Sequence, residues 1–116
     1  MLTLYGLKSC DTCKKALAAL KAAAVETRFI DIRAEADLAA TVPAWLETVG
    51  AEALINKRST TWRGLDDAAK AAAEGEGAAA LLIANPTLIK RPVIEAPSGV
   101  TAGWTAAIAA ALTAGG

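Results

Sequence analysis

The sequence contains no histidine, and its only cysteines are Cys10 and Cys13. The absence of histidine excludes Ser-His and Cys-His catalysis within one chain and removes the commonest metal ligand. Two cysteines complete a tetrahedral zinc site only if two chains share the ion, which makes zinc a weak alternative. A glycine pattern that binds phosphate is also missing. We therefore expect no metal and no nucleotide or flavin cofactor.

The sequence also lacks an excess of charge of one sign and any long apolar run. Its 12 Lys and Arg side chains balance 12 Asp and Glu side chains, which argues against a nucleic-acid partner or an anionic membrane. The longest apolar runs, Ala78–Ala84 and Ala106–Leu112, are too short to span a bilayer. A strand pattern that begins at Leu2 leaves no room for a signal peptide, so we expect a cytoplasmic protein.

At 116 residues the chain is long enough for one domain with its own core. Hydrophobic residues make up 54% of it, but much of this share is alanine, which favours helix and buries little apolar area. The core therefore depends on scattered Leu, Ile, Val and Trp side chains. Because we find no internal repeat and no dividing linker, we expect a single domain over residues 1–116.

The most informative stretch is Gly6–Lys15, in which Cys10 and Cys13 form a Cys-x-x-Cys motif. An alternating run over Leu2–Tyr5 predicts a strand before it, and the pattern over Thr12–Ala24 predicts a helix after it. The first cysteine then lies beside the unpaired N–H groups of the first helical turn, which favour a thiolate together with the helix dipole. In the cytoplasm, such a pair is more often redox-active than a structural disulfide.

The helical spacing places the two cysteines differently. Cys13, Leu17 and Leu20 recur on one face of the predicted helix, whereas Cys10 lies at its exposed start. This asymmetry predicts an attacking Cys10 and makes Cys13 a candidate resolving cysteine. Lys8 adds positive charge beside the turn and favours the thiolate. The alternative is that both cysteines are simply small buried residues, which the agreement of spacing, helix start and flanking lysines disfavours.

The remaining pattern predicts the architecture. Val25–Ile32 is a predicted strand, parallel to the first because a helix connects the two. The chain over about 34–86 contains predicted short helices, one capped by Thr41, one begun at Asp66 and one over Ala78–Ala84. A β-α-β opening with Cys-x-x-Cys at its first turn predicts an α/β protein of thioredoxin-like fold. We expect it to close with two strands and a helix, and to carry the helical subdomain as an insertion.

A second informative stretch is Thr87–Glu95, in which Pro92 leads into a predicted strand. Sequence statistics disfavour a cis bond at this proline, because only about one X–Pro bond in twenty is cis. Arg91 offers a bidentate guanidinium to an oxyanion, or it lies on the surface. A last edge strand over Val100–Ala102 and a helix capped by Thr105 complete the prediction.

The polar stretch Asn56–Gly64 has two interpretations. Its cations Lys57, Arg58 and Arg63 surround Trp62, which suits a loop that binds anions and faces the thiolate. The same residues also suit an irregular solvated connection whose tryptophan fills the core. The second interpretation is the more common one for such a stretch.

Four motifs follow one another in an order typical of a known family. They are Tyr5-Gly6 ahead of Lys8-x-Cys10-Asp11-Thr12, then Thr60-Thr61-Trp62-Arg63 with Leu65, then Leu88-Ile89-Lys90-Arg91-Pro92, and finally Gly103-Trp104. With these motifs the chain resembles the arsenate-reductase-like family, which includes the Spx regulators and the YffB-type proteins. It is most similar to the YffB-type branch, whose members are proposed glutathione-dependent thiol reductases.

The resemblance implies a thioredoxin-like sheet with an inserted helical subdomain and a site built on named residues. Cys10 is the implied nucleophile, Arg91 holds the oxyanion or thiolate, and Arg58 lies in the region of another functional arginine. Pro92 corresponds to the proline that lies beside the active cysteine in thioredoxin-like domains. A third arginine of the arsenate reductases falls near Gly103-Trp104, where this chain has none, which disfavours arsenate as the substrate.

We therefore expect a small thiol-dependent reductase that acts as a monomer. Cys10 attacks a disulfide or a small oxyanion, Cys13 or glutathione resolves the adduct, and glutathione or a redoxin supplies the electrons. Three alternatives stay open. The Cys-x-x-Cys motif resembles that of the Spx regulators, so the chain is alternatively a redox-switched adaptor that binds RNA polymerase or another protein. The others are a true arsenate reductase and a fold relic with neither activity.

Overall fold

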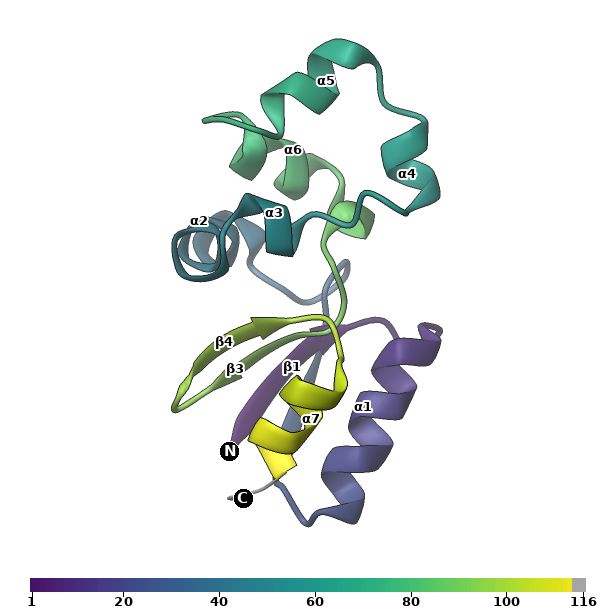
Figure 1. Ribbon diagram of the computed structural model, residues 1–116, viewed down its shortest axis with the longest axis vertical. Coiled ribbons are helices and arrows are strands. Elements are labelled where there is room, and N and C mark those ends of the chain that lie inside the picture. Colours follow the sequence, from purple (N-terminus) through teal and green to yellow (C-terminus); the bar gives the residue numbers. More distant parts are fainter. Residues whose placement is uncertain (114–116) are drawn as a thin grey trace. The chain divides into compact units, whose positions relative to one another are not determined.

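The computed structural model describes residues 1–113 of the chain, which fold into two compact units (Figure 1). Residues 1–36 and 91–113 form a sheet unit, and residues 37–90 form a helical unit. Within the described residues, we find no helix with the length and apolar character needed to cross a membrane.

The sheet unit contains a four-stranded sheet in the order β2-β1-β3-β4. Its strands are β1 (Leu2–Gly6), β2 (Thr27–Asp31), β3 (Val93–Ala96) and β4 (Gly99–Ala102). Helix α1 (Asp11–Ala22) connects β1 to β2, and these two strands are parallel, with Leu4 opposite Phe29. Strand β3 runs antiparallel to both β1 and β4, with Ile94 opposite Leu4. The predicted α/β, thioredoxin-like fold is confirmed.

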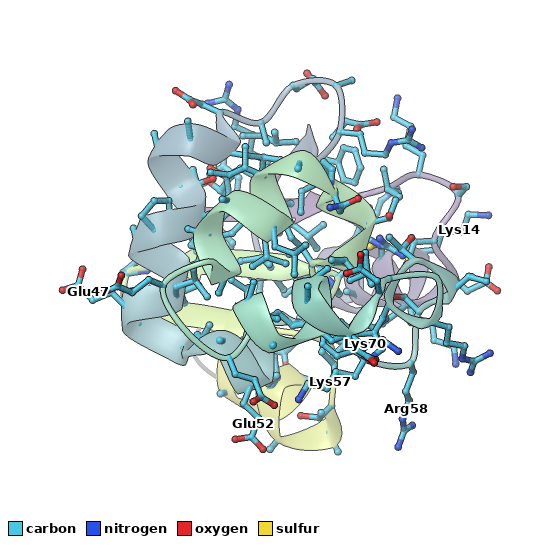
Figure 2. The ribbon with its side chains drawn as sticks, turned by 90° about the horizontal axis from the view of Figure 1, so that it is seen from above. Lys14, Glu47, Glu52, Lys57, Arg58 and Lys70 are labelled. Carbon is cyan, nitrogen blue, oxygen red and sulfur yellow. The ribbon has the colours of Figure 1, made fainter. Side chains whose placement is uncertain are left out.

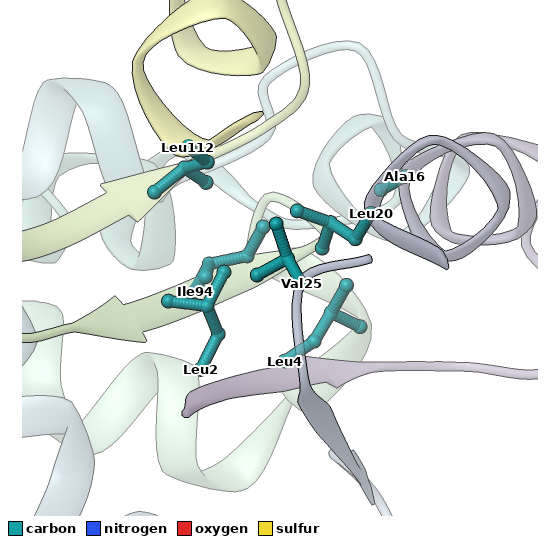
Figure 3. Packing of buried hydrophobic residues seen from close by; sticks show 7 residues of the cluster. All are labelled: Leu2, Leu4, Ala16, Leu20, Val25, Ile94 and Leu112. Carbon is teal, nitrogen blue, oxygen red and sulfur yellow. The ribbon is translucent and has the colours of Figure 1, made fainter. Parts of the chain in front are cut away.

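The core of the sheet unit lies between one face of the sheet and the helices α1 and α7 (Ala106–Thr113), which Figure 1 shows on the same side. Seven of its side chains, none more than 8% exposed, appear in Figure 3: Leu2, Leu4, Ala16, Leu20, Val25, Ile94 and Leu112. Leu2 and Leu4 share this face because alternate strand residues point the same way. The hydroxyl of Thr105 accepts the Ile108 N–H at 3.1 Å, which confirms the predicted cap of α7.

The helical unit consists of short helices. Their bounds are α2 (Leu38–Val49), α3 (Ala51–Leu54), α4 (Thr60–Arg63), α5 (Asp67–Ala72), α6 (Ala78–Ala84) and the 3-10 turn η1 (Pro86–Leu88). Trp45, Leu54 and Leu82 are fully buried. The Asn56 N–H donates to the Leu88 carbonyl and the Lys90 N–H donates to the Leu54 carbonyl, both at 2.7 Å. These two bonds join the segment after α3 to the segment after α6.

Helix α2 begins earlier than the sequence predicted. Asp37, and not Thr41, is its N-cap, and the Asp37 carboxylate accepts the Ala40 N–H at 3.2 Å. The prediction relied on a proline in the first turn, but the structure places Pro43 inside the helix. The earlier start buries Leu38 on the same face as Val42 and Trp45 and gives the first turn its aspartate cap, and these two contributions together offset the cost of an interior proline.

Two other predicted bounds were wrong. Strand β2 is shorter than the predicted Val25–Ile32, because the Val25 N–H donates to the Leu20 carbonyl at 2.9 Å and so belongs to the turn that ends α1. The stretch after Asn56, predicted to be irregular, contains helix α4. The Ser59 hydroxyl caps that helix by accepting the Trp62 N–H at 3.1 Å.

Candidate active site

Cys10 is the N-cap residue of α1, in the loop that follows β1. Its N–H donates to the Leu7 carbonyl at 3.1 Å, and its carbonyl accepts the Lys14 N–H at 3.0 Å. A tight turn on one side and the first helical turn on the other therefore hold its backbone. The side chain is partly exposed, so a substrate can reach the sulfur.

The surroundings of the Cys10 sulfur favour its thiolate form. Burial raises the pKa of Cys10, but hydrogen bonds from the backbone N–H and the thiol of Cys13 lower it. The Arg91 guanidinium lowers it further through a hydrogen bond and its positive charge. The net effect is a pKa for Cys10 below the ordinary value of a cysteine.

Cys13 has the opposite character. Its side chain is 0% exposed, and this burial, reinforced by the neighbouring Cys10, raises the pKa of Cys13 to about 11. A hydrogen bond with the Leu7 backbone acts in the other direction without reversing the shift. Cys13 therefore stays a thiol at neutral pH and offers its S–H to the Cys10 thiolate.

Gly6, the last residue of β1, comes very close to Cys13. A Cβ atom built at Gly6 would lie 2.5 Å from the Cys13 Sγ and 3.3 Å from the Cys13 Cβ. From the sequence, Gly6 stood out only as the first residue of the Cys-x-x-Cys stretch and as part of the Tyr5-Gly6 motif. The feature of the sequence that could have indicated this contact is a glycine at the end of a strand shortly before the Cys-x-x-Cys motif, because glycine in a strand often marks a close approach to the backbone.

The structure brings Arg91 and Pro92 to this site from the far end of the chain. Because Tyr5 in β1 lies opposite Val93 in β3, the residues after Tyr5 and before Val93 meet at one end of the sheet. Pro92 is buried, and its carbonyl accepts the Gly103 N–H at 2.9 Å. The Arg91–Pro92 peptide bond is cis, contrary to the expectation from sequence statistics.

Lys8 is exposed and lines an open groove of about 580 Å³ beside the Cys10 turn. The groove lies between two segments that follow parallel strands: Leu7, Lys8 and Ser9 after β1, and Asp31, Arg33 and Ala34 at the end of β2. The Asp31 carboxylate accepts the N–H groups of Arg33 at 2.8 Å and Ala34 at 2.9 Å. These hydrogen bonds lower the pKa of Asp31, and the charges of Arg33 and Lys8 lower it further. Arg33 was not among the residues that the sequence predicted for the site.

Arg58, predicted from the resemblance to lie in the region of a functional arginine, belongs to the helical unit. It is exposed in the turn between α3 and α4, and Figure 2 shows its side chain projecting outward. Nearby, the Trp62 ring is half-buried, with Lys57 Nζ 5.5 Å and Lys70 Nζ 5.9 Å from its centre. Trp62 thus contacts ammonium groups through cation–π interactions and does not fill the core.

Over residues 1–113, no three His, Cys, Asp or Glu side chains form a group suited to a metal ion. The reactive groups of the site are thus a thiolate, a buried thiol and a guanidinium. This combination suits nucleophilic attack by sulfur on a disulfide or an oxyanion, because the thiolate is the attacking form and the guanidinium stabilises negative charge.

Known proteins resemble this chain over almost its whole length. An uncharacterized protein from Haemophilus influenzae is 45% identical over 95 residues, which is 81% of this chain and 82% of that protein. The solved structure of the YFFB (PA3664) protein is 34% identical with a TM-score of 0.83, over 97% of this chain and 99% of that one. An arsenate reductase (ArsC) related protein from Brucella melitensis is 34% identical with a TM-score of 0.76, over 95% and 92% of the two chains.

A more distant structure shares the fold alone. The arsenate reductase from Vibrio cholerae is 14% identical to this chain, with a TM-score of 0.66 over 96% of it and 93% of that chain. The model of the ArsC family matches residues 5–111, which include Cys10, Cys13, Arg91 and Pro92. Because this match spans nearly the whole sequence, the chain belongs to the ArsC family.

Proposed function

We propose that this ArsC-family protein is a thiol-dependent reductase in which Cys10 is the nucleophile and glutathione is the reducing thiol. The observation that carries the proposal is the lowered pKa of Cys10 at the start of α1, where the Cys13 N–H and S–H and the Arg91 guanidinium converge on its sulfur. A site that favours a partly exposed thiolate is typical of cysteines that react with substrates.

The reaction is a thiol–disulfide exchange in two steps. The Cys10 thiolate attacks one sulfur of a disulfide R–S–S–R′, so that the Cys10–S–S–R bond forms and R′–S⁻ leaves. A glutathione thiolate then attacks the R sulfur of this mixed disulfide, which gives glutathione–S–S–R and restores the Cys10 thiolate. Arg91 stabilises the negative sulfur at the start and at the end of the cycle.

The burial of Cys13 supports an external resolving thiol. With a pKa of about 11, Cys13 is a thiolate in only about one molecule in 10,000 at pH 7. Formation of the mixed disulfide removes the charge of Cys10, but burial, which is the largest cause of the raised pKa, remains. Resolution by Cys13, through a Cys10–Cys13 disulfide, is therefore the slower alternative.

An oxyanion substrate is a second candidate, and the position of Arg91 favours it. A guanidinium at the nucleophilic sulfur can hold two oxygens of an oxyanion while the thiolate attacks its centre. The groove lined by Lys8 and Arg33 adds positive charge beside the same turn. Arsenate reduction with glutathione as the reductant would show this activity directly.

The test measures reduction of a glutathione mixed disulfide by the wild type, Cys10→Ser and Cys13→Ser, with glutathione as the reductant. We expect turnover by the wild type and by Cys13→Ser, none by Cys10→Ser, and a glutathione adduct on Cys10 by mass spectrometry. Turnover by Cys10→Ser, or none by the wild type with either this substrate or arsenate, would contradict the proposal. Accumulation of the adduct in Cys13→Ser alone would assign resolution to Cys13.

A further inference from the structure

The Cys13 thiol occupies a space that exists only because residue 6 is glycine. Any side chain there would begin with a Cβ atom 2.5 Å from the Cys13 Sγ, a separation that unbonded atoms do not tolerate. Gly6 does not have a positive φ, unlike Gly50, Gly99 and Gly103. The backbone would therefore accept alanine, and the need for glycine arises from the contact with Cys13 alone.

We propose that Gly6 is a positioning residue of the active site: it holds the Cys13 S–H against the Cys10 sulfur and so maintains the reactive thiolate. The inference rests on the proposed role of Cys10 as the nucleophile. It assigns a function to a glycine that touches no substrate and acts only through Cys13.

The strand cannot move away to make room for a side chain at position 6. Gly6 is the last residue of β1, paired with Asp31 in the parallel ladder to β2, and its carbonyl accepts the Ile32 N–H at 2.9 Å. The built Cβ would also lie 3.4 Å from a methyl group of Leu4, which is an ordinary van der Waals contact, so the contact with Cys13 decides whether a side chain fits. The backbone at Gly6 is thus held in place, and the Cys13 sulfur would have to move.

A displaced Cys13 sulfur weakens the stabilisation of Cys10. The Cys13 thiol is one of the groups that lower the pKa of Cys10, and a hydrogen bond loses strength steeply when its length and angle change. Arg91 and the Cys13 N–H remain, so only part of the effect is lost. We expect Gly6→Ala to raise the pH midpoint of Cys10 alkylation by about one pH unit, the scale of one hydrogen bond to a charged group.

The experiment is a double-mutant cycle read from the alkylation of Cys10, with mass spectrometry of the peptide that contains it. The variants are Gly6→Ala, Cys13→Ala and the double variant. Gly6→Ala and Cys13→Ala should each raise the midpoint, and Gly6→Ala should have no further effect when Cys13 is already alanine. Gly75→Ala is the matched control, since nothing lies within 4 Å of a Cβ built there, and should leave the midpoint unchanged.

The cycle separates positioning from simple loss of stability. If Gly6→Ala folds and keeps the wild-type midpoint, or raises it equally with and without Cys13, the proposal is wrong. If Gly6→Ala does not fold, the double variant still tests the claim, because it lacks the clashing sulfur and keeps only the 3.3 Å contact with the Cβ of residue 13, which a shift of a few tenths of an ångström relieves: it should fold and match Cys13→Ala. A double variant that also fails to fold, or whose midpoint differs from that of Cys13→Ala, contradicts the proposal. Because alkylation does not require turnover, failure of the reductase proposal would be seen separately, in Cys10→Ser.

Discussion

Helix α1 of the sheet unit begins in a different way from three helices of the helical unit. In the helical unit, α2, α4 and α5 begin at Asp37, Ser59 and Asp66, and an oxygen of each side chain accepts a backbone N–H of the first turn. In the sheet unit, α1 begins at Cys10, where no such oxygen is present. An oxygen cap typically stabilises a helix by about 1 kcal/mol, whereas a neutral thiol is a weak acceptor.

The oxygen caps contribute to the stability of the fold, whereas the start of α1 favours the thiolate form of Cys10. Helices α4 and α5 have four and six residues, contain no buried residue and rely on their caps. Helix α1 has 12 residues and is anchored by burial of Ala16 and Leu20, so it tolerates a poor cap. The first-turn N–H of Cys13 is left to stabilise the anionic sulfur of Cys10. Four predictions, from the largest expected effect to the smallest, test this contrast.

Cys10→Ser should break the contrast by giving α1 an oxygen cap. We expect disulfide reduction to fall by on the order of a thousandfold or more, since the nucleophile is lost. The free energy of unfolding should stay equal or rise by up to about 1 kcal/mol. Turnover with a glutathione mixed disulfide and chemical denaturation measure the two effects. A variant that is inactive and clearly less stable would show that the Cys10 sulfur also supports the fold.

Arg91→Gln should sharpen the contrast, because it removes the guanidinium that stabilises the Cys10 thiolate. It leaves the backbone at the start of α1 and the oxygen caps of the helical unit intact. The pKa of Cys10 should rise, and turnover at pH 7 should fall by up to about tenfold for each pH unit by which the midpoint moves. At pH values above both midpoints, the alkylation rates of variant and wild type should converge. Lys90→Gln, at the exposed neighbouring position, is the control. Equal midpoints for Arg91→Gln and the wild type would remove Arg91 from the site.

Asp66→Ala should act on stability alone. The Asp66 carboxylate accepts the Ala69 N–H at 2.8 Å, and loss of this cap should lower the free energy of unfolding by about 1 kcal/mol. The midpoint of Cys10 alkylation should not change. Asp67→Ala, which removes a first-turn acid without removing the cap, should cost less. A shift of the Cys10 midpoint in Asp66→Ala would show that the two roles are not separate.

Tyr5 tests whether burial also shifts the pKa of a side chain in the sheet unit other than the two cysteines. Burial first, and then the hydrogen bond from the Tyr5 hydroxyl to Glu95 at 3.1 Å, raise the pKa of Tyr5 to about 12. Since the folded pKa is above the unfolded value of about 10, the stability from this group is complete below pH 10 and is lost towards pH 12. Tyr5 is the only tyrosine, so tyrosinate absorbance isolates it.

Glu95→Gln provides the control for Tyr5. It removes the negative charge and should lower the midpoint of tyrosinate formation, while leaving the raising effect of burial. A midpoint near 10 in the folded wild type would contradict both assignments.

Local patterns predicted the parts of the fold that depend on neighbouring residues. The helix over Ala78–Ala84 has the predicted bounds, and the predicted caps at Asp66 and Thr105 are present. Both follow from the local sequence, because periodicity and cap residues act within one or two turns. The start of α2 was misplaced, since burial of Leu38 outweighed the local signal from Pro43. The cis bond before Pro92 was also missed, because general X–Pro statistics carry no information on the particular strand pairing around it.

By itself, the sequence predicted thiol chemistry at Cys10, the helix that begins there and the resemblance to the ArsC family. Tertiary structure alone decided which groups surround the sulfur. Pairing of β1 with β3 brings Arg91 to Cys10, and the close approach of Gly6 seats the Cys13 thiol beside it. The physical reason is the separation along the chain over which each effect acts. Secondary structure follows from contacts within a few residues, whereas a pKa depends on burial and on charges that arrive from distant parts of the chain.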